Sequence, residues 1–294
     1  MSKADKKAKK HDRKPRVPTL AKQADRYELY GLSVQDPDHE VKFFDKVYSE
    51  FFGRRKPVIL REDFCGTFAV CCAWVQAGRD RIAVGVDLDD EPLEWGRQHN
   101  LAPLTASQQQ RVTLMQADVR SVAKPKAHIL AAQNFSFWIF KTRQAVVEYF
   151  KAARENLADD GLFILDMMGG YECFEERHED IRDIDWPGVD AAGKKRKSFT
   201  YVWEQHAFNP VNHDASFYIH FRFRDGSTLK RAFEYHWRFW SVPEVREMLE
   251  EAGFGETHAY WEGTLKNGEG DDNWQKAASA PSDPSWIAYI IARK

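Results

Sequence analysis

An apolar stretch that runs through a tight turn into a helix most constrains what this chain can fold into. Residues 57–62 are predicted to form a strand, Cys65-Gly66-Thr67 a turn and residues 67–77 a helix. A second apolar strand, residues 82–87, ends at Asp87. In such a βαβ unit the first turn brings the backbone against a ligand, and a carboxylate that ends the second strand can accept both ribose hydroxyls. The sequence therefore predicts a site for a nucleoside-type cofactor.

The turn lacks features that phosphate-bearing cofactors need. A dinucleotide site uses glycines at fixed offsets, so that the backbone and a helix N-terminus reach the pyrophosphate. Here Phe64 and Phe68 flank the single Gly66, and the chain has no G-x-x-x-x-G-K-[ST] run for a triphosphate. The pattern favours an adenosine cofactor without phosphates.

At this point the chain resembles the class I S-adenosylmethionine-dependent methyltransferases. Their first motif, an acidic residue followed by a turn of the form G-C-G-T-G, corresponds to Glu62–Phe68, with two motif glycines replaced by phenylalanine. The resemblance continues through Asp87, Gln116–Val119 and Leu157–Asp166, and it spans roughly residues 55–170. It implies an α/β fold of the Rossmann-like, doubly wound type, with a seven-stranded, mostly parallel sheet.

The resemblance also implies the cofactor and its contacts: S-adenosyl-L-methionine, with S-adenosyl-L-homocysteine as product and no metal. Asp87 would bind the ribose hydroxyls, Asp118 the adenine amine and Val119 the adenine ring. Tyr27 and Tyr30 would belong to N-terminal helices that cover the cofactor as a lid, although a packing role is an equal alternative. The expected cofactor-binding residues are Tyr27, Tyr30, Glu62, Cys65, Gly66, Thr67, Asp87, Leu88, Asp118, Val119, Asn134 and Phe135.

Strand and helix patterns alternate between residues 57 and 166, which predicts a parallel sheet with helices on both faces. Glu62, Asp87, Asp118 and Asn134 all fall at or just beyond the carboxyl ends of expected strands, where ligands gather in such sheets. The expected segments are a basic disordered tail (1–18), a helical lid (19–56), the cofactor-binding core (57–170), an inserted loop with an antiparallel cover sheet (171–240), and a C-terminal helix with closing strands (241–294).

Within the inserted segment, the spacing of apolar side chains changes to the alternation that is typical of strands. Residues 199–208, 215–224 and 228–239 are predicted to form three antiparallel strands, the last two joined by an Asp225-Gly226 hairpin turn. We expect this three-stranded sheet to cover the acceptor site. The charged residues 172–197 and the stretch 263–284 are expected to be loops.

Candidate catalytic residues are few, because methyl transfer from a sulfonium is mainly a matter of positioning. The stretch Asn134-Phe135-Ser136-Phe137 occupies the place of the N-P-P-Y motif of amino-group methyltransferases, which makes Asn134 a candidate to hold an amine. His220 and His236 are candidate bases on the cover sheet, although a structural role is the alternative for each. Arginines on this sheet would suit an anionic substrate.

Charge limits the class of partner. The net charge is −2, but residues 1–16 carry +6, so the rest of the chain carries −8, which argues against broad nucleic-acid binding. Four cysteines without C-x-x-C spacing predict reduced thiols and a cytoplasmic location, and the lack of an apolar run as long as a membrane span predicts no membrane attachment. We therefore expect a methyltransferase that acts on nitrogen or oxygen of a small molecule and that can form a homo-oligomer. A protein or RNA acceptor and a non-catalytic cofactor-binding regulator are the alternatives.

Overall fold

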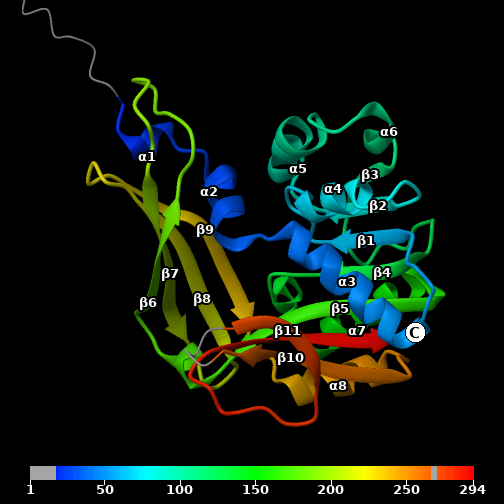
Figure 1. Cartoon of the computed structure of the whole chain (residues 1–294). Helices are drawn as coiled ribbons and strands as arrows, with labels where there is room; N and C mark the ends of the chain where they lie inside the picture. The colour runs from blue at the N-terminus through cyan, green and yellow to red at the C-terminus, as the bar shows by residue number, and fades with distance from the viewer. Residues whose placement is uncertain (1–17, 266–269) are drawn as a thin grey trace, which may run out of the picture.

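Two β-sheets lie side by side, as a computed structural model of the chain shows, with one edge of the larger sheet toward the smaller sheet (Figure 1). The structure describes residues 18–265 and 270–294, so the expected basic tail up to residue 17, and Gly268 of the expected 263–284 loop, lie outside the described residues. The larger sheet has the strand order β11-β10-β12-β5-β4-β1-β2-β3, and the smaller has the order β6-β7-β8-β9. The doubly wound α/β architecture expected from the sequence is confirmed.

The larger sheet is parallel in its first five strands and antiparallel where β12 joins β5. These five strands are β1 (Ile59–Asp63), β2 (Ile82–Asp87), β3 (Val112–Gln116), β4 (Ala127–Ala132) and β5 (Leu157–Gly169). The antiparallel strands are β10 (Glu256–Thr264), β11 (Gly270–Ala277) and β12 (Trp286–Arg293). The sheet therefore has eight strands in the described part of the chain, one more than the seven expected.

Helices cover both faces of this sheet. The helices of the described residues are α1 (Leu20–Gln23), α2 (Arg26–Val34), α3 (Pro37–Phe52), α4 (Ala69–Gln76), α5 (Asp90–Gly96), α6 (Ala106–Gln109), α7 (Arg143–Asn156) and α8 (Val242–Glu251), with a π-helical turn at Arg97–Leu101 and 3-10 turns at Ser136–Ile139 and Tyr171–Phe174. Of these, α1 and α2 lie against the smaller sheet. Local signals set several of their starts. The Thr142 hydroxyl accepts a hydrogen bond from the Ala145 N–H at α7, and Ser241 with Glu244 forms a capping box at α8.

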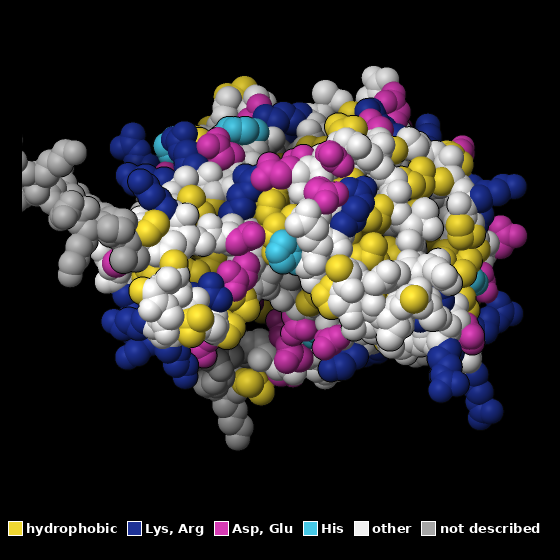
Figure 2. Space-filling view, turned by 90° about the horizontal axis from the view of Figure 1, so that it is seen from above, with side chains coloured by type: hydrophobic (Ala, Val, Ile, Leu, Met, Phe, Trp, Pro, Cys, Tyr) yellow, Lys and Arg dark blue, Asp and Glu magenta, His cyan; other side chains and the backbone are white. Residues whose placement is uncertain are grey.

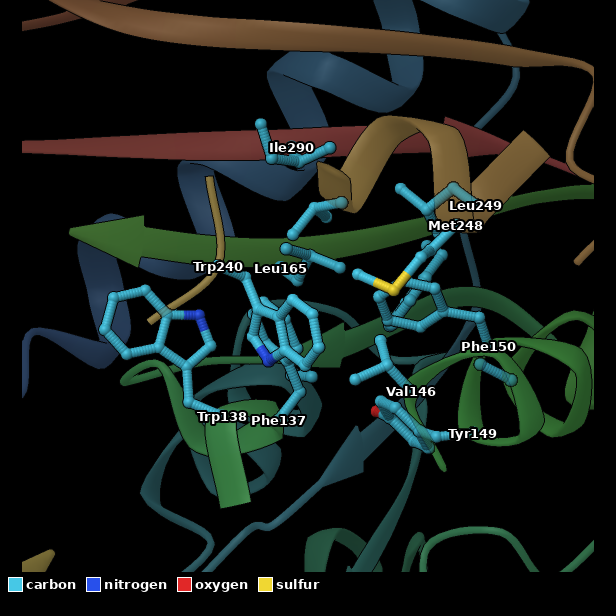
Figure 3. Packing of buried hydrophobic residues seen from close by; sticks show 14 of the residues in the cluster. Phe137, Trp138, Val146, Tyr149, Phe150, Leu165, Trp240, Met248, Leu249 and Ile290 are labelled. Atoms are coloured by element: carbon cyan, nitrogen blue, oxygen red, sulfur yellow. The ribbon is translucent and has the colours of Figure 1, made fainter. Parts of the chain in front are cut away.

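The apolar core lies in two layers on either side of the large sheet. On one side, α7 and α8 bury Phe150, Met248 and Leu249 against Leu165 of β5 and Ile290 of β12, as Figure 3 shows from close by. On the other side, α3 and α4 bury a second cluster that includes Phe44 and Trp74. Because both faces are covered, the central strands are almost wholly apolar, and this is why the sequence could predict them.

The smaller sheet, called the cover sheet below, consists of β6 (His178–Asp185), β7 (Ser198–Phe208), β8 (Asp214–Arg222) and β9 (Thr228–Arg238). It has four strands, whereas three were expected, because β6 lies in the expected loop 172–197. The register pairs His178 with Gln205 and Asp185 with Ser198, so β6 is bonded to β7 along its whole length. Most of its side chains are exposed, and a polar edge strand of this kind carries no hydrophobic pattern.

The expectation of a loop at 263–284 is wrong in the same way for β11. Its side chains are mostly exposed, and Trp274 is the buried one among them. The strand is held by backbone pairing to β10, for example between Tyr260 and Lys276. Main-chain hydrogen bonds therefore determine both added edge strands, and a pattern of side chains cannot show them.

The arrangement brings the carboxyl ends of the parallel strands toward the cover sheet (Figure 1). The 3-10 turn after β4 packs against β9, and α2 lies against β6. All four cysteines are buried and free of disulfides. In the described ranges, no helix combines the length and apolar character that crossing a lipid bilayer would require.

Candidate functional site

The turn between β1 and α4 carries unusual backbone strain. Phe64, Gly66 and Phe68 adopt φ values of 57°, 50° and 47°, in the left-handed region. For a side-chain-bearing residue this conformation costs about 1–2 kcal/mol. Phe68 is fully buried, and the ring of Phe64 packs against the ring of Tyr149 with their centroids 5.6 Å apart. Packing therefore holds both phenylalanines in place. The phenylalanines thus adopt the conformation that glycine adopts most easily, and strain of this kind is concentrated at functional sites.

Asp87 joins this turn to the end of β2. Its Oδ2 accepts a hydrogen bond from the Gly66 N–H at 2.7 Å, and its Oδ1 accepts one from the Asp89 N–H at 3.0 Å. A Cβ at Gly66 would meet nothing within 4 Å, so open space lies beside the turn. The next residue, Leu88, is 71% exposed. A carboxylate, an open turn and an uncovered apolar side chain together fit the ribose and adenine of an adenosine cofactor.

Three other expected cofactor residues, at the end of β1 and within the turn, have buried side chains. Glu62, Cys65 and Thr67 are all buried, and Glu62 accepts a hydrogen bond from the Cys71 N–H at 3.1 Å. Burial raises the pKa of Glu62 to about 7. The Thr67 carbonyl accepts a hydrogen bond from the Asn100 amide at 2.9 Å. These groups have partners within the chain, so they support the turn.

The loop after β3 holds Asp118 and Val119. Asp118 forms an ion pair with Arg120 at 2.6 Å, and this hydrogen-bonded partner lowers the pKa of the Asp118 carboxyl. Val119 is buried, and its carbonyl accepts a hydrogen bond from Arg61 Nη2 at 2.7 Å. The loop is therefore anchored to β1 while the Asp118 carboxylate remains partly exposed.

That anchor is a buried charged network. Arg61 pairs with Asp63 at 2.6 Å, both side chains being almost fully buried, and Arg61 also donates to the Ser121 carbonyl. The Tyr149 hydroxyl donates to the other oxygen of Asp63 at 3.1 Å. Burial raises the pKa of Asp63 to about 6, although Arg61 opposes the shift. The network positions the loop that carries Asp118 and Val119.

A second strained turn follows β4. Asn134 and Phe135 have φ values of 56° and 58°, two left-handed residues in succession. Their backbone N–H groups donate to the two oxygens of Asp166 on β5, at 2.9 and 2.8 Å. Burial raises the pKa of Asp166 to about 6. One buried carboxylate therefore holds the turn in a conformation that these residues rarely adopt.

This turn opens into a cavity of about 690 Å³ between the large sheet and the cover sheet. Aromatic side chains form much of its wall. They are Tyr30, Phe135, Tyr201, Trp203, Tyr235, Trp237, Trp274 and Tyr289. On β7 and β9 the lining residues alternate, because successive side chains of a strand point to opposite faces of the sheet. The cover sheet thus presents an aromatic face to the strained end of β4.

Glu40 on α3 also lines the cavity. Its Oε1 accepts a hydrogen bond from the Tyr289 hydroxyl at 2.7 Å, while its Oε2 is buried without a partner among the described residues. Burial is the main cause that raises the pKa of Glu40 to about 8, and the neighbouring carboxylates Asp166 and Asp36 add to it. A carboxyl of this kind can bind a cation or exchange a proton near neutral pH.

The expected residues are only partly brought together at this cavity. Tyr30, Asn134 and Phe135 line it, whereas the remaining expected cofactor residues lie at the β1–α4 turn, at the end of β2, in the loop after β3 and, for Tyr27, on α2. Tyr27 is buried, and its hydroxyl accepts a hydrogen bond from Arg26 at 2.8 Å.

The prediction that two cover-sheet histidines act as bases needs correction. Ile219 and Trp237 line the cavity, so their neighbours His220 and His236 point to the opposite face of the sheet. His220 is bonded there to Glu204 at 2.7 Å and accepts a hydrogen bond from the Arg231 N–H. His236 lies 3.1 Å from the Ser216 hydroxyl. The structure therefore does not bring either histidine to the site.

Sequence reasoning missed the carboxyls and the aromatic wall of the cavity. Asp166 lay within a quoted motif without being given a role, and Glu40 lay in a helix expected only to act as a lid. The alternation of Tyr201, Trp203 and Gln205 on β7 was a usable signal, since all three line the cavity. No comparable local signal marks Glu40 beside Tyr289, because the pair forms only in the folded chain.

Comparison with known proteins supports the sequence-based resemblance. No family model matches the chain. The chain is 24% identical over 198 residues to the "Putative methyltransferase YqeM" of Bacillus subtilis (strain 168), a match that covers 65% of this chain and 70% of the relative.

Three solved structures illustrate the architecture that this chain shares. An S-adenosylmethionine-dependent methyltransferase from Clostridium acetobutylicum ATCC 824 has a TM-score of 0.61 at 15% identity, covering 91% of this chain and 96% of its own. DesVI from Streptomyces venezuelae has a TM-score of 0.64 at 15% identity, with coverage of 91% and 96%. CalS10 from Micromonospora echinaspora, an amino pentose methyltransferase solved with S-adenosylmethionine bound, has a TM-score of 0.63 at 14% identity, covering 92% of this chain and 98% of its own. These likenesses confirm the Rossmann-like fold.

Proposed function

We propose that this chain, which has the fold and motif order of the class I S-adenosylmethionine-dependent methyltransferases, transfers a methyl group to nitrogen or oxygen of a small molecule. The observation that carries the proposal is the position of the cavity. It begins at the strained turn of Asn134 and Phe135, at the carboxyl edge of the sheet, and it is closed by the cover sheet. An acceptor held there would lie beside a cofactor bound across the ends of β1, β2 and β4.

The residues present suit the proposed cofactor. Asp87 would accept the ribose hydroxyls, Leu88 and Val119 would contact the adenine, and Asp118 would accept from its amine. S-adenosylmethionine supplies an electrophilic methyl group: the acceptor's lone pair bonds to the methyl carbon as the carbon–sulfur bond breaks, and sulfur keeps that electron pair. The chain then has to orient the acceptor, exclude water and take up any proton that the acceptor loses.

The size of the cavity supports a small acceptor. At about 690 Å³ it falls within the range of about 300–1,000 Å³ that is usual for small-molecule sites. Proteins of similar fold include the sugar N-methyltransferase KedS8 from Streptoalloteichus sp ATCC 53650 and the glycopeptide N-methyltransferase MtfA. These neighbours make nitrogen the leading candidate for the acceptor atom.

Calorimetric titration with S-adenosylmethionine, S-adenosylhomocysteine and NAD tests the proposal. We expect both sulfur compounds to bind, NAD not to bind, and Asp87→Asn to weaken binding by about a hundredfold, because two hydrogen bonds to a charged group are lost. Asp90→Asn, at an exposed carboxylate on α5, is the matched control and should bind as the wild type does. Binding of NAD in preference to the sulfur compounds would overturn the proposed function.

A further inference from the structure

The unpartnered oxygen of Glu40 is the most unusual polar group in the cavity. Glu40 Oε1 is hydrogen-bonded to Tyr289, whereas Oε2 is buried without a well-formed hydrogen bond among the described residues, and the Gln133 side chain is near enough to oppose the rise in the Glu40 pKa. A buried acceptor without a donor is costly, and most such groups in native proteins have a partner. Since Glu40 lines the cavity, a ligand bound there can pair with this oxygen more closely than Gln133 does.

The charges around the cavity favour a cation. Among its described lining residues are eight carboxyl side chains, Asp166 and Glu262 included, but Arg182 is the one guanidinium. Acidic side chains also gather on either side of the hollow in the middle of the molecule seen from above (Figure 2). A phosphate or carboxylate on the ligand would be repelled there, whereas a positive charge would be attracted. This departs from the anionic substrate that arginines on the cover sheet suggested.

The cover sheet adds a second feature that suits a cation. Trp203 on β7 and Tyr235 on β9 lie with ring centroids 5.8 Å apart, and Tyr235 and Trp237 lie 4.4 Å apart. All three rings line the cavity from the side opposite Asp166 of the large sheet. The faces of tryptophan and tyrosine rings attract ammonium groups, and more strongly when water is excluded.

We propose that the molecule methylated by this chain is a basic amine, and that Glu40 is the catalytic residue that binds its nitrogen and takes the proton it must lose. The proposal rests on the proposed function, and it extends that function from a small molecule to a chemical class. It places the positive charge between the Glu40 carboxylate and the aromatic wall of Trp203, Tyr235 and Trp237.

The proton step balances within the cavity. An ammonium nitrogen has no free lone pair, so one N–H bond has to break before the nitrogen can be methylated. The proton moves to Glu40 Oε2, and the electron pair of the broken bond stays on nitrogen. The products of this step are a neutral amine and a neutral carboxyl, which suit a cavity with a largely aromatic wall better than two separate charges do. Tyr289 holds the other carboxyl oxygen in place throughout.

Binding to protein saturated with S-adenosylhomocysteine tests this class of ligand. The probes are 2-phenylethylamine and cyclohexylamine, each compared with its alcohol (2-phenylethanol, cyclohexanol) and with a carboxylate of similar size (phenylacetate, cyclohexanecarboxylate). Fluorescence of the cavity tryptophans reports binding. We expect the amines to bind about tenfold tighter than the alcohols, and Glu40→Gln to remove that preference. Glu50→Gln is the matched control, because Glu50 lies on the same helix and accepts from Tyr260 at 2.6 Å outside the cavity.

Proton uptake or release during amine binding gives a second measurement that a merely structural role would not change. Because burial raises the pKa of Glu40 to about 8, binding of an ammonium at pH 7 should release about one proton, measured by calorimetry in buffers of different ionisation enthalpy. Glu40→Gln should release none. The inference is overturned if amines show no preference over alcohols and carboxylates, or if Glu40→Gln keeps both signals. Failure of S-adenosylhomocysteine itself to bind would instead overturn the proposed function.

Discussion

The two halves of the proposed site are built in opposite ways. In the cofactor half, around the β1–α4 turn and Asp87, the polar groups are bonded to the chain itself, as Asp87 is to Gly66. In the acceptor half, Glu40 Oε2 has no partner in the described residues. The first half comes from two adjacent βα units, whereas Glu40 and Tyr289 are 249 positions apart. A site for a shared cofactor can thus be rigid and local, while the part that selects the acceptor is assembled from distant elements.

Loss of the buried Arg61 network should disrupt the rigid cofactor half of the site. Arg61→Met leaves Asp63 buried without its charge partner and frees the loop that carries Val119. Removing one member of a buried pair costs about 3–5 kcal/mol, so urea unfolding should show a loss of that size. Arg97→Met, at an exposed ion pair on the surface, is the control and should cost less than about 1 kcal/mol. Equal effects of the two changes would contradict the anchoring role.

The pH dependence of stability would sharpen the contrast between the halves. The pKa of Glu40 lies near its ordinary value in the unfolded chain, but in the folded chain burial raises it to about 8, with Asp166, Asp36 and Tyr289 facing the carboxyl. A raised carboxyl pKa stabilises the fold below the unfolded value, and this contribution is lost as pH rises to the folded value. Between pH 5 and 8 the wild type should lose roughly 3 kcal/mol of unfolding free energy relative to Glu40→Gln.

Chemical denaturation across this pH range measures the difference, with Glu50→Gln as the reference carboxylate on the same helix. Asp118 in the cofactor half has a pKa shifted the opposite way, downward, by its bond to Arg120. The contrast would fail if wild type and Glu40→Gln lost stability in parallel.

Leu88 tests the cofactor half without disturbing the fold. Its side chain is 71% exposed, so Leu88→Ala should leave the melting temperature unchanged. If the adenine ring covers Leu88, the same change should weaken S-adenosylhomocysteine about tenfold, since burial of a leucine side chain is lost. Titration of both proteins measures this, and undiminished affinity would place the adenine elsewhere.

Trp203 tests the aromatic wall of the acceptor half. Trp203→Leu should weaken 2-phenylethylamine about fivefold, because an electron-rich ring face is lost, while Trp203→Phe should weaken it by about twofold. Binding of S-adenosylhomocysteine serves as the internal control and should not change. A loss of cofactor binding as large as the loss of amine binding would show that the wall is shared by both halves.

The smallest effects are expected for the cover-sheet histidines. His220→Ala and His236→Ala should leave the affinities for both S-adenosylhomocysteine and 2-phenylethylamine within about twofold of the wild type, since both rings lie on the outer face of the cover sheet. A tenfold loss of amine binding in either variant would return that histidine to the site.

Much of the fold could be predicted from the sequence, because its signals are local. The apolar strands β1, β2 and β4 and the caps at Thr142 and Ser241 depend on neighbours within a few residues. The edge strands β6 and β11 could not be predicted in this way. Their side chains are mostly exposed, so the pairing of their backbones with β7 and β10 left no pattern in the sequence.

The residues of the site show the same difference between local sequence signals and tertiary packing. The cofactor residues were expected from motif order, and their roles stay predictions that the geometry fits. His220 and His236 were placed wrongly because alternation along a strand shows that two faces exist, but not which face covers the cavity. The Glu40–Tyr289 pair required the fold itself, since α3 and β12 meet only through tertiary packing.

The most direct test measures the affinities of two variants, Asp87→Asn and Glu40→Gln, for the cofactor product and for the amine probe. The account predicts that Asp87→Asn weakens S-adenosylhomocysteine about a hundredfold, and that Glu40→Gln leaves it within about twofold. With S-adenosylhomocysteine saturating, Glu40→Gln should lose the roughly tenfold preference for 2-phenylethylamine over 2-phenylethanol, and Asp87→Asn should keep it. If Glu40→Gln weakened S-adenosylhomocysteine as strongly as Asp87→Asn does, Glu40 would belong to the cofactor half, and the division of the site would be contradicted.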